Sequence, residues 1–430
     1  MKITAIVLFI VMYVLMIAFP KRRAITALST AVLFLVITLL PIGDMPILEL
    51  SDIPRVVNWN VIMMITGTMI IVDFFIESKM PNVIAESLLR VAPNILWVTV
   101  LMSVFSGIIS AFIDNVATVL MVAPVAMVIC KKLNVKPVGM IICIAVSSNL
   151  QGAATLVGDT TSIMLAGAAN MNFADFFVMH GKAGMFFATE LGAFFTIPIM
   201  IMMFRKEKAP VTSGERTKIN DFFPTVMMIS YVLALIIASF IPGTPDNING
   251  YICLTGAAVT IIGELIFRKN TAGIKHSIKS LDIDMVLLLI GLFCVIGGIT
   301  NVGVIGDLAS LIAKAGGSNK FLLYTIVVWG SVLISAFIDN IPYVATMLPI
   351  LGTVATTLGV EPYFLYFGLL AGATLGGNLT PIGASANIAG VGMLRKEGYE
   401  VSFGDFMKIG IPFTLTAVMT GYLFIWFVWA

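Results

Sequence analysis

The sequence predicts an all-α integral membrane protein with about ten transmembrane helices plus two re-entrant hairpins, in two inverted-topology repeats with broken helices. The first observation is composition: 59% of the 430 residues are hydrophobic, 11% are charged, and the mean hydropathy is +1.05. A soluble domain carries about 25% charged residues. The net charge of +2 does not suggest a nucleic-acid partner. We therefore expect a multi-pass protein of the plasma membrane, with the lipid bilayer as its main partner.

The second observation is a series of apolar segments about 20 residues long, the length that crosses a bilayer as a helix. Eight are continuous: 3–19, 24–42, 59–77, 182–204, 222–242, 250–267, 283–299 and 407–429. Two further segments, 138–168 and 362–392, are interrupted by polar and glycine-rich runs, and we interpret them as broken helices. The cluster Lys21–Arg23 follows the first segment and no A-x-A cleavage site is present, so we expect a retained span rather than a signal peptide.

Orientation follows from short basic loops, which favour the cytoplasm. The basic loops are 21–23, 131–136, 205–218, 268–279 and 395–396, whereas 43–57 and 243–249 are acidic or nearly neutral. All basic loops lie in the cytoplasm and the other two loops outside only if segment 95–130 enters and leaves on the cytoplasmic face. Segment 320–358 must likewise enter and leave on the outer face. Each segment has one Asp-Asn pair at its turn and no charged loop there, which favours re-entrant hairpins over pairs of full spans. Both termini are then expected outside.

The third observation is an internal repeat. Ser110-Ala-Phe-Ile-Asp114-Asn115 recurs as Ser335-Ala-Phe-Ile-Asp339-Asn340, an offset of 335 − 110 = 225. Thr155-Leu-Val-Gly158 matches Thr380-Pro-Ile-Gly383 at the same offset. Two matched features at one spacing indicate a duplicated chain.

The duplication divides the chain into a first repeat (1–204), a cytoplasmic linker (205–221) and a second repeat (222–430). The hairpins enter from opposite sides, so the repeats are inverted in the membrane. Inverted repeats with interrupted helices are typical of secondary transporters whose substrate site lies near the midplane. Irregular backbone at that depth needs surrounding protein or water to satisfy it.

Asp114 and Asp339 are the strongest candidates for the site. A carboxylate at mid-membrane costs about 2.5–3.5 kcal/mol on insertion scales, so two at matched positions need a reason. Burial disfavours the charged form, and a cation or a proton then competes for the carboxylate. The alternative is that each aspartate only caps the second helix of its hairpin.

The remaining candidates are polar residues at the tips and in the unwound segments. Glycine lets the backbone open, and hydroxyl, amide and carbonyl groups can replace a hydration shell; a helix-packing face is the alternative. The candidates are Asn115, Ser148, Asn149, Thr155, Gly158, Asp159 and Thr160 in the first repeat, and Asn340, Asn378, Thr380, Gly383, Ser385 and Asn387 in the second. Asp73 and Glu190 lie within spans without acidic mates and are weaker candidates for a proton relay or an ion pair.

The segments 110–125, 335–350, 147–167 and 372–390 resemble the ion-transporter superfamily, in the branch of arsenite permeases, NhaD-type Na+/H+ antiporters and the P protein, which share a citrate-transporter-like domain. The resemblance implies a scaffold domain and a mobile transport domain, with each hairpin tip meeting an unwound helix at the binding site. It also makes a homodimer an expected assembly. The dicarboxylate carriers have Ser-Asn-Thr signatures where this chain has Asp-Asn, which disfavours a carboxylate substrate.

Together these features predict a proton-coupled secondary active transporter of a small inorganic ion, by arsenite or antimonite efflux or by Na+/H+ exchange. Dicarboxylate or citrate uptake is an alternative. No enzyme activity is expected: an intramembrane aspartyl protease would have Gly-x-Gly-Asp, but Leu156 precedes Val157-Gly158-Asp159. A channel is also less favoured.

No cofactor is expected beyond Na+ or H+ as a coupling ion, and no metal site beyond possible Na+ at Asp114 and Asp339. The four cysteines are separated and lack metal-ligand spacing. The chain has no P-loop, so ATP-driven transport would require a separate ATPase subunit.

Overall fold

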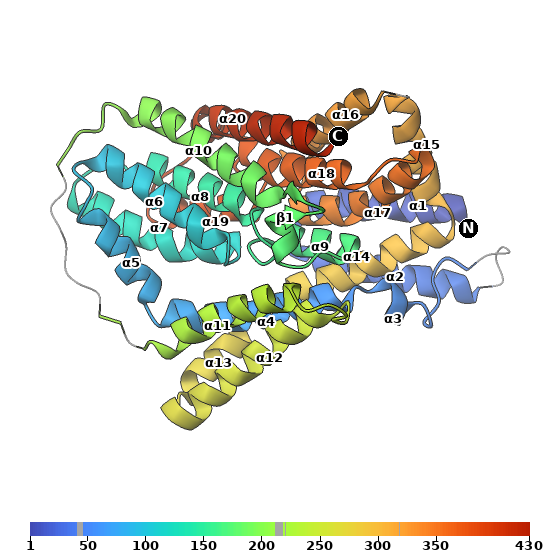
Figure 1. Cartoon of the computed structure of the whole chain (residues 1–430), viewed down its shortest axis with the longest axis horizontal. Coiled ribbons are helices and arrows are strands. Elements are labelled where there is room, and N and C mark those ends of the chain that lie inside the picture. Colours follow the sequence, from blue (N-terminus) through green and yellow to red (C-terminus); the bar gives the residue numbers. More distant parts are fainter. Residues whose placement is uncertain (41–45, 211–217, 220, 318) are drawn as a thin grey trace.

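The computed structural model describes residues 1–40, 46–210, 218–219, 221–317 and 319–430. The described chain is almost entirely helical, with one two-stranded sheet, β1 (Val178–Met179) and β2 (Lys182–Ala183). Most helices run along the longest axis of the molecule; the N-terminus lies near one end of that axis, and the C-terminus, at the end of α20, lies nearer the middle (Figure 1). The predicted linker 205–221 lies partly outside the described residues.

The first half begins with two short helices joined by a 3-10 turn, followed by one long span and the first hairpin. Its elements are α1 (Lys2–Ala18), η1 (Pro20–Arg22), α2 (Arg23–Leu39), α3 (Ile53–Val56), α4 (Trp59–Glu77), α5 (Met80–Leu89), α6 (Ile95–Ser110), α7 (Asn115–Lys132), α8 (Val138–Gly152), α9 (Thr160–Ala169), η2 (Ala174–Phe176) and α10 (Met185–Phe204).

The second half repeats this order. Its elements are α11 (Phe223–Ser239), α12 (Ile248–Gly263), η3 (Glu264–Arg268), α13 (Thr271–Ser280), α14 (Ile283–Asn301), α15 (Val304–Gly316), α16 (Lys320–Ser335), α17 (Asn340–Leu358), α18 (Tyr363–Gly376), η4 (Gly377–Leu379), α19 (Ser385–Lys396) and α20 (Phe403–Trp429). The offset of 225 extends to element starts, since α2 begins at Arg23 and α12 at Ile248.

The two predicted hairpins are present as α6–α7 and α16–α17, and they occupy opposite ends of the molecule (Figure 1). The residues that begin and end each turn are buried: Ser110 and Ser335 fully, with Asn115 and Asn340 4% and 3% exposed, although Phe337 within the second turn is exposed. A turn between two full spans would instead lie at a membrane surface. The buried tips support the re-entrant interpretation.

Helices of the two halves pack against each other in a reciprocal pattern. Helix α2 packs on α14 and α12 on α4, while α9 packs on α17 and α19 on α7. Each contact in one half therefore has a counterpart with the halves exchanged, as expected for a duplicated chain with two-fold pseudosymmetry. The unwound segments 153–159 and 380–384, which separate α8 from α9 and η4 from α19, lie beside the hairpin tips.

The structure differs from the predicted elements in several details. Among the described residues, eight helices are long and apolar enough to cross a membrane. They include α7 and α17, whereas α1 and α11 are 17 residues long and fall just below that length. The basic loop 268–279 is largely the helix α13, and the predicted span 182–204 begins at Met185 because Lys182 lies in β2.

Candidate functional site

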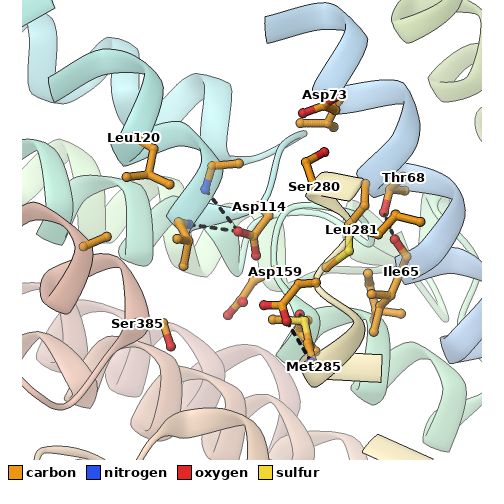
Figure 2. Close-up of a pocket in the computed structure, with 18 of the residues that line it drawn as sticks. Ile65, Thr68, Asp73, Asp114, Leu120, Asp159, Ser280, Leu281, Met285 and Ser385 are labelled. Atoms are coloured by element: carbon orange, nitrogen blue, oxygen red, sulfur yellow. Dashed lines mark hydrogen bonds between the residues drawn. The ribbon is translucent and has the colours of Figure 1, made fainter. Parts of the chain in front are cut away.

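A cavity of about 540 Å³ lies between the first hairpin, the first unwound segment and helices α4, α14 and α19. Figure 2 shows Asp114 and Asp159 close together in its centre, with Asp73 and Ser280 above them and Ser385 at one side. Four carboxylates and two basic side chains line it: Asp73, Asp114, Asp159, Asp282, Lys21 and Arg23. Because Lys21 and Ser280 are exposed residues of its wall, the cavity reaches the surface beside the basic segments predicted to be cytoplasmic.

Asp114 is held by the start of α7. Its Oδ2 accepts hydrogen bonds from the backbone N–H groups of Val116 (3.0 Å) and Ala117 (3.2 Å). An aspartate at this position satisfies amides that have no partner within the helix. Asp114 therefore both caps α7 and lines the cavity.

Asp339 caps α17 in the same way but has additional partners. Its Oδ1 accepts from the N–H of Ile341 (3.1 Å), and its Oδ2 accepts from Arg23 Nη1 (2.6 Å) and Ser385 Oγ (2.9 Å). Arg23 Nη2 also donates to Ser385 Oγ at 3.5 Å. Asp339 of the second tip thus forms an ion pair with Arg23 of the first half. Among the described residues, no basic side chain forms an ion pair with Asp114.

The unwound segments contact the tips through matched bonds. The hydroxyl of Thr155 donates to the carbonyl of Ala111, and that of Thr380 donates to the carbonyl of Ala336. The two glycines allow this close approach. A Cβ on Gly158 would lie 2.6 Å from the carbonyl oxygens of Gly152 and Ser110, and one on Gly383 would meet Gly377 at 2.5 Å and Ser335 at 2.7 Å. Only glycine fits where backbone passes this closely.

Buried amides join the two halves at the centre of the molecule. Asn149 Nδ2 donates to the carbonyl of Thr374 (2.7 Å) and to Asn378 Oδ1 (3.0 Å), while Asn378 Nδ2 donates to the carbonyl of Val146 (2.9 Å). Asn115 Nδ2 donates to Asn149 Oδ1 at 2.9 Å. These amides find their hydrogen-bond partners in one another and in backbone carbonyls of the two broken helices, as buried polar groups require.

The sequence-predicted residues therefore divide into two groups. Those that line the cavity are Asp114, Asp159, Thr160 and Ser385. Those that hold the tips and unwound segments around it are Asn115, Ser148, Asn149, Thr155, Gly158, Asp339, Asn378, Thr380, Gly383 and Asn387. Asn340 stands apart, since its buried Nδ2 has no hydrogen-bond partner among the described residues.

Asp159 and the weaker candidates have distinct surroundings. Asp159 Oδ2 accepts from Thr161 Oγ1 at 2.6 Å, and Thr161 Oγ1 also lies 3.0 Å from Thr374 Oγ1. Asp73 lines the cavity near its mouth, 3.5 Å from His276 Nδ1. Glu190 lies elsewhere and accepts from Gln151 Nε2 at 3.3 Å.

Sequence reasoning missed Arg23 and Asp282 as site residues. Arg23 was assigned to a cytoplasmic loop, but it begins α2 beside the second tip. Asp282 caps α14 through the N–H of Met285 and lines the cavity. Among the described residues, no group of three or more His, Cys, Asp or Glu side chains is arranged to hold a metal ion.

Comparisons with known proteins agree with this architecture. A family model described as "Citrate transporter" matches residues 13–372. The uncharacterized transporter Rv2684 of Mycobacterium tuberculosis is 29% identical over 451 residues, covering 99% of this chain and 98% of that protein. The human P protein is 24% identical over 465 residues, covering 88% of this chain and 54% of the P protein. The crystal structure of the Alcanivorax borkumensis YdaH transporter superposes with a TM-score of 0.62 at 13% identity, covering 94% and 95% of the two chains, and so shares the fold.

Proposed function

This chain belongs to the citrate transporter family, and we propose that it is a proton-coupled secondary active transporter of the plasma membrane that exchanges sodium ions for protons. The family model spans most of the chain, and full-length relatives are themselves transporters. Alternating access between the two membrane faces is the mode of transport that inverted repeats with broken helices serve.

The observation that carries the choice of cargo is the acidic cavity wall. Acidic groups outnumber basic ones by four to two, and Asp114 and Asp159 face the same space (Figure 2). Within the described parts of the chain, neither carboxylate forms an ion pair. Such a wall attracts a cation and opposes an anion, and proximity of carboxylates favours binding of either a proton or a metal cation.

Exchange follows from mutually exclusive occupancy of these carboxylates. A sodium ion bound by Asp114 and Asp159 neutralises the cavity, and so do protons on the same oxygens. The neutralised hairpin and unwound segment can then move relative to α4 and α14 without transferring a bare carboxylate through an apolar barrier, which is costly. The backbone of the first tip lies directly against Gly158, and this contact keeps the tip and the unwound segment together during the movement.

Arsenite or antimonite is the second candidate cargo, and one observation favours it. Arsenite is a neutral trihydroxide near neutral pH and needs hydroxyl and amide partners rather than a fixed charge. Thr160 and Ser385 supply hydroxyl groups to the cavity wall. The buried Nδ2 of Asn340, at the second tip and outside the cavity lining, is a hydrogen-bond donor without a partner among the described residues. Citrate, the cargo in the family's description, is the third candidate, because its carboxylates would face four aspartates.

The test uses everted membrane vesicles loaded with a pH-sensitive dye and energised so that their lumen is acidic. Adding sodium is expected to release protons from vesicles that contain the protein and not from vesicles that contain the Asp114→Asn variant at the same protein level. Arsenite and citrate are added in parallel. Proton release by citrate alone, with no response to sodium, would contradict the proposal.

A further inference from the structure

Arg23 connects the two parts of the molecule that border the cavity. It is the first residue of α2, which packs on α1 and α14, and its side chain reaches the tip of the second hairpin. The side chains of Arg23 and Asp339 are only 29% and 13% exposed. The ion pair joins residues 316 positions apart and lies at the edge of the cavity that Arg23 lines.

The pair has no counterpart in the other half. The residue of the second half at the position of Arg23 is Ile248, which begins α12 at the offset of 225. The turn before it, residues 240–247, contains no lysine or arginine. Asp114, the mate of Asp339, accordingly has no ion pair among the described residues. Since the tips are identical in sequence, the ion pair is not something that the tip itself requires.

We propose that Arg23 is a tethered competitor of the transported cation: its guanidinium occupies Asp339 and must leave that carboxylate when the cargo cation binds there. The proposal rests on the proposed function, since it takes the cargo to be a monovalent inorganic cation. It makes Arg23 a specificity-determining residue that sets how much cation is needed to load the site.

Competition follows from the geometry at Oδ2. This oxygen already accepts from Arg23 and Ser385, and Oδ1 is used by the helix cap of α17. Asp339 does not itself line the cavity, because Arg23 and Ser385, which do, both occupy its Oδ2. A cargo cation that passes from Asp114 and Asp159 to Asp339 must therefore displace the guanidinium, because like charges repel strongly at such short range in a partly buried site. A guanidinium stays protonated at every physiological pH, so its occupancy depends on the cation rather than on its own titration.

The test measures sodium-driven proton release in everted vesicles as a function of sodium concentration, for wild type and Arg23→Gln. The KM for sodium is expected to fall about tenfold in Arg23→Gln, and the maximal rate is expected to fall because the ion leaves a tighter site more slowly. The matched control is Arg22→Gln. It removes the same charge from the neighbouring residue, whose side chain does not line the cavity, so its KM should equal that of wild type.

Two further variants keep the test decisive if Arg23→Gln does not fold. Arg23→Lys keeps the charge but loses the two-pronged donor geometry, and its KM should lie between those of wild type and Arg23→Gln. The double variant Arg23→Asp/Asp339→Arg restores an ion pair with the charges exchanged. A purely structural pair predicts recovered transport in it, whereas competition predicts a folded protein without sodium exchange.

The failures are distinguishable. If wild type exchanges sodium but Arg23→Gln and Arg23→Lys keep its KM, or if the charge-exchanged variant transports, the role of Arg23 is refuted and the proposed function stands. If wild-type protein is present in the vesicles and sodium releases no protons, the proposed function fails and competition at Asp339 fails with it.

Discussion

The two hairpin tips have the same six residues but different neighbours. In both tips the aspartate caps the following helix, Asp114 through two backbone amides and Asp339 through one, and both tips accept the same threonine bond from their unwound segment. Yet Asp339 is paired with Arg23, while Asp114 faces the cavity without an ion pair among the described residues. The comparison teaches that the repeated sequence specifies the shape of the tip, and that residues distant in the chain specify what each tip can bind.

The largest expected effect is at Asp114. Asp114→Asn should abolish sodium-driven proton release, a loss of at least about 100-fold, because an amide can neither take up a proton nor neutralise a cation. Asparagine is also a good N-cap, so the variant should remain folded, as checked by its level in the membrane and its elution as a single species in detergent. Wild-type exchange in this variant would remove Asp114 from the transport step.

Asp339→Asn should abolish exchange as well, but it also leaves Arg23 without its carboxylate. Removing one partner of a buried ion pair costs about 3–5 kcal/mol, and the pair here is only partly buried, so a smaller loss of thermal stability is expected. Adding Arg23→Gln should recover the stability and not the transport. Equal stability of Asp114→Asn and Asp339→Asn would show that the tips differ less than their contacts indicate.

The second effect tests what the tips share. Gly158→Ala and Gly383→Ala should each destabilise the protein by about 1–3 kcal/mol, since the added methyl group meets backbone oxygens that cannot move away. The thermal midpoint of the purified protein measures the loss. Gly392→Ala is the control, because a Cβ there meets no atom within 4 Å. A large loss in one repeat only would contradict the equivalence of the two unwound segments.

The smallest effect separates the two tip asparagines. Asn115→Ala removes the donor to Asn149 Oδ1 and should cost about 1–3 kcal/mol, whereas Asn340→Ala removes an Nδ2 that has no partner among the described residues and should cost less. The same thermal midpoints provide the comparison. Unchanged stability with lost transport in Asn340→Ala would assign this amide to cargo binding.

Much of the fold could be predicted from the sequence because the relevant signals are local or periodic. Apolar length placed the spans, and the repeated Ser-Ala-Phe-Ile-Asp-Asn sequence placed both hairpins. The short helices α5, α13 and α15 were not predicted, since they are too short to span and α13 contains basic residues typical of a loop. The strands β1 and β2, at two residues each, have no alternation to detect.

The site could be predicted only in part. Asp114 and Asp159 were identified because a carboxylate within an apolar segment needs a reason to be there. The pairing of Arg23 with Asp339 spans 316 residues, and nothing within either segment encodes it. Arg23 belongs to a basic cluster of the kind that sets membrane orientation. That common role explains its charge, so the sequence gives no reason to predict a place for it at the cavity.

The unequal partners Arg23 and Ile248 also have a consequence for the resting carrier. In a transporter made of inverted repeats, exchanging the conformations of the halves generates the state that opens to the opposite face. We expect Ile248 to take the place beside Asp114 in that state and Arg23 to leave Asp339. The two states would then differ by one ion pair, and each 1.4 kcal/mol of that difference would shift their ratio about tenfold. The Arg23–Asp339 ion pair should therefore raise the population of the conformation whose cavity opens toward the basic loops.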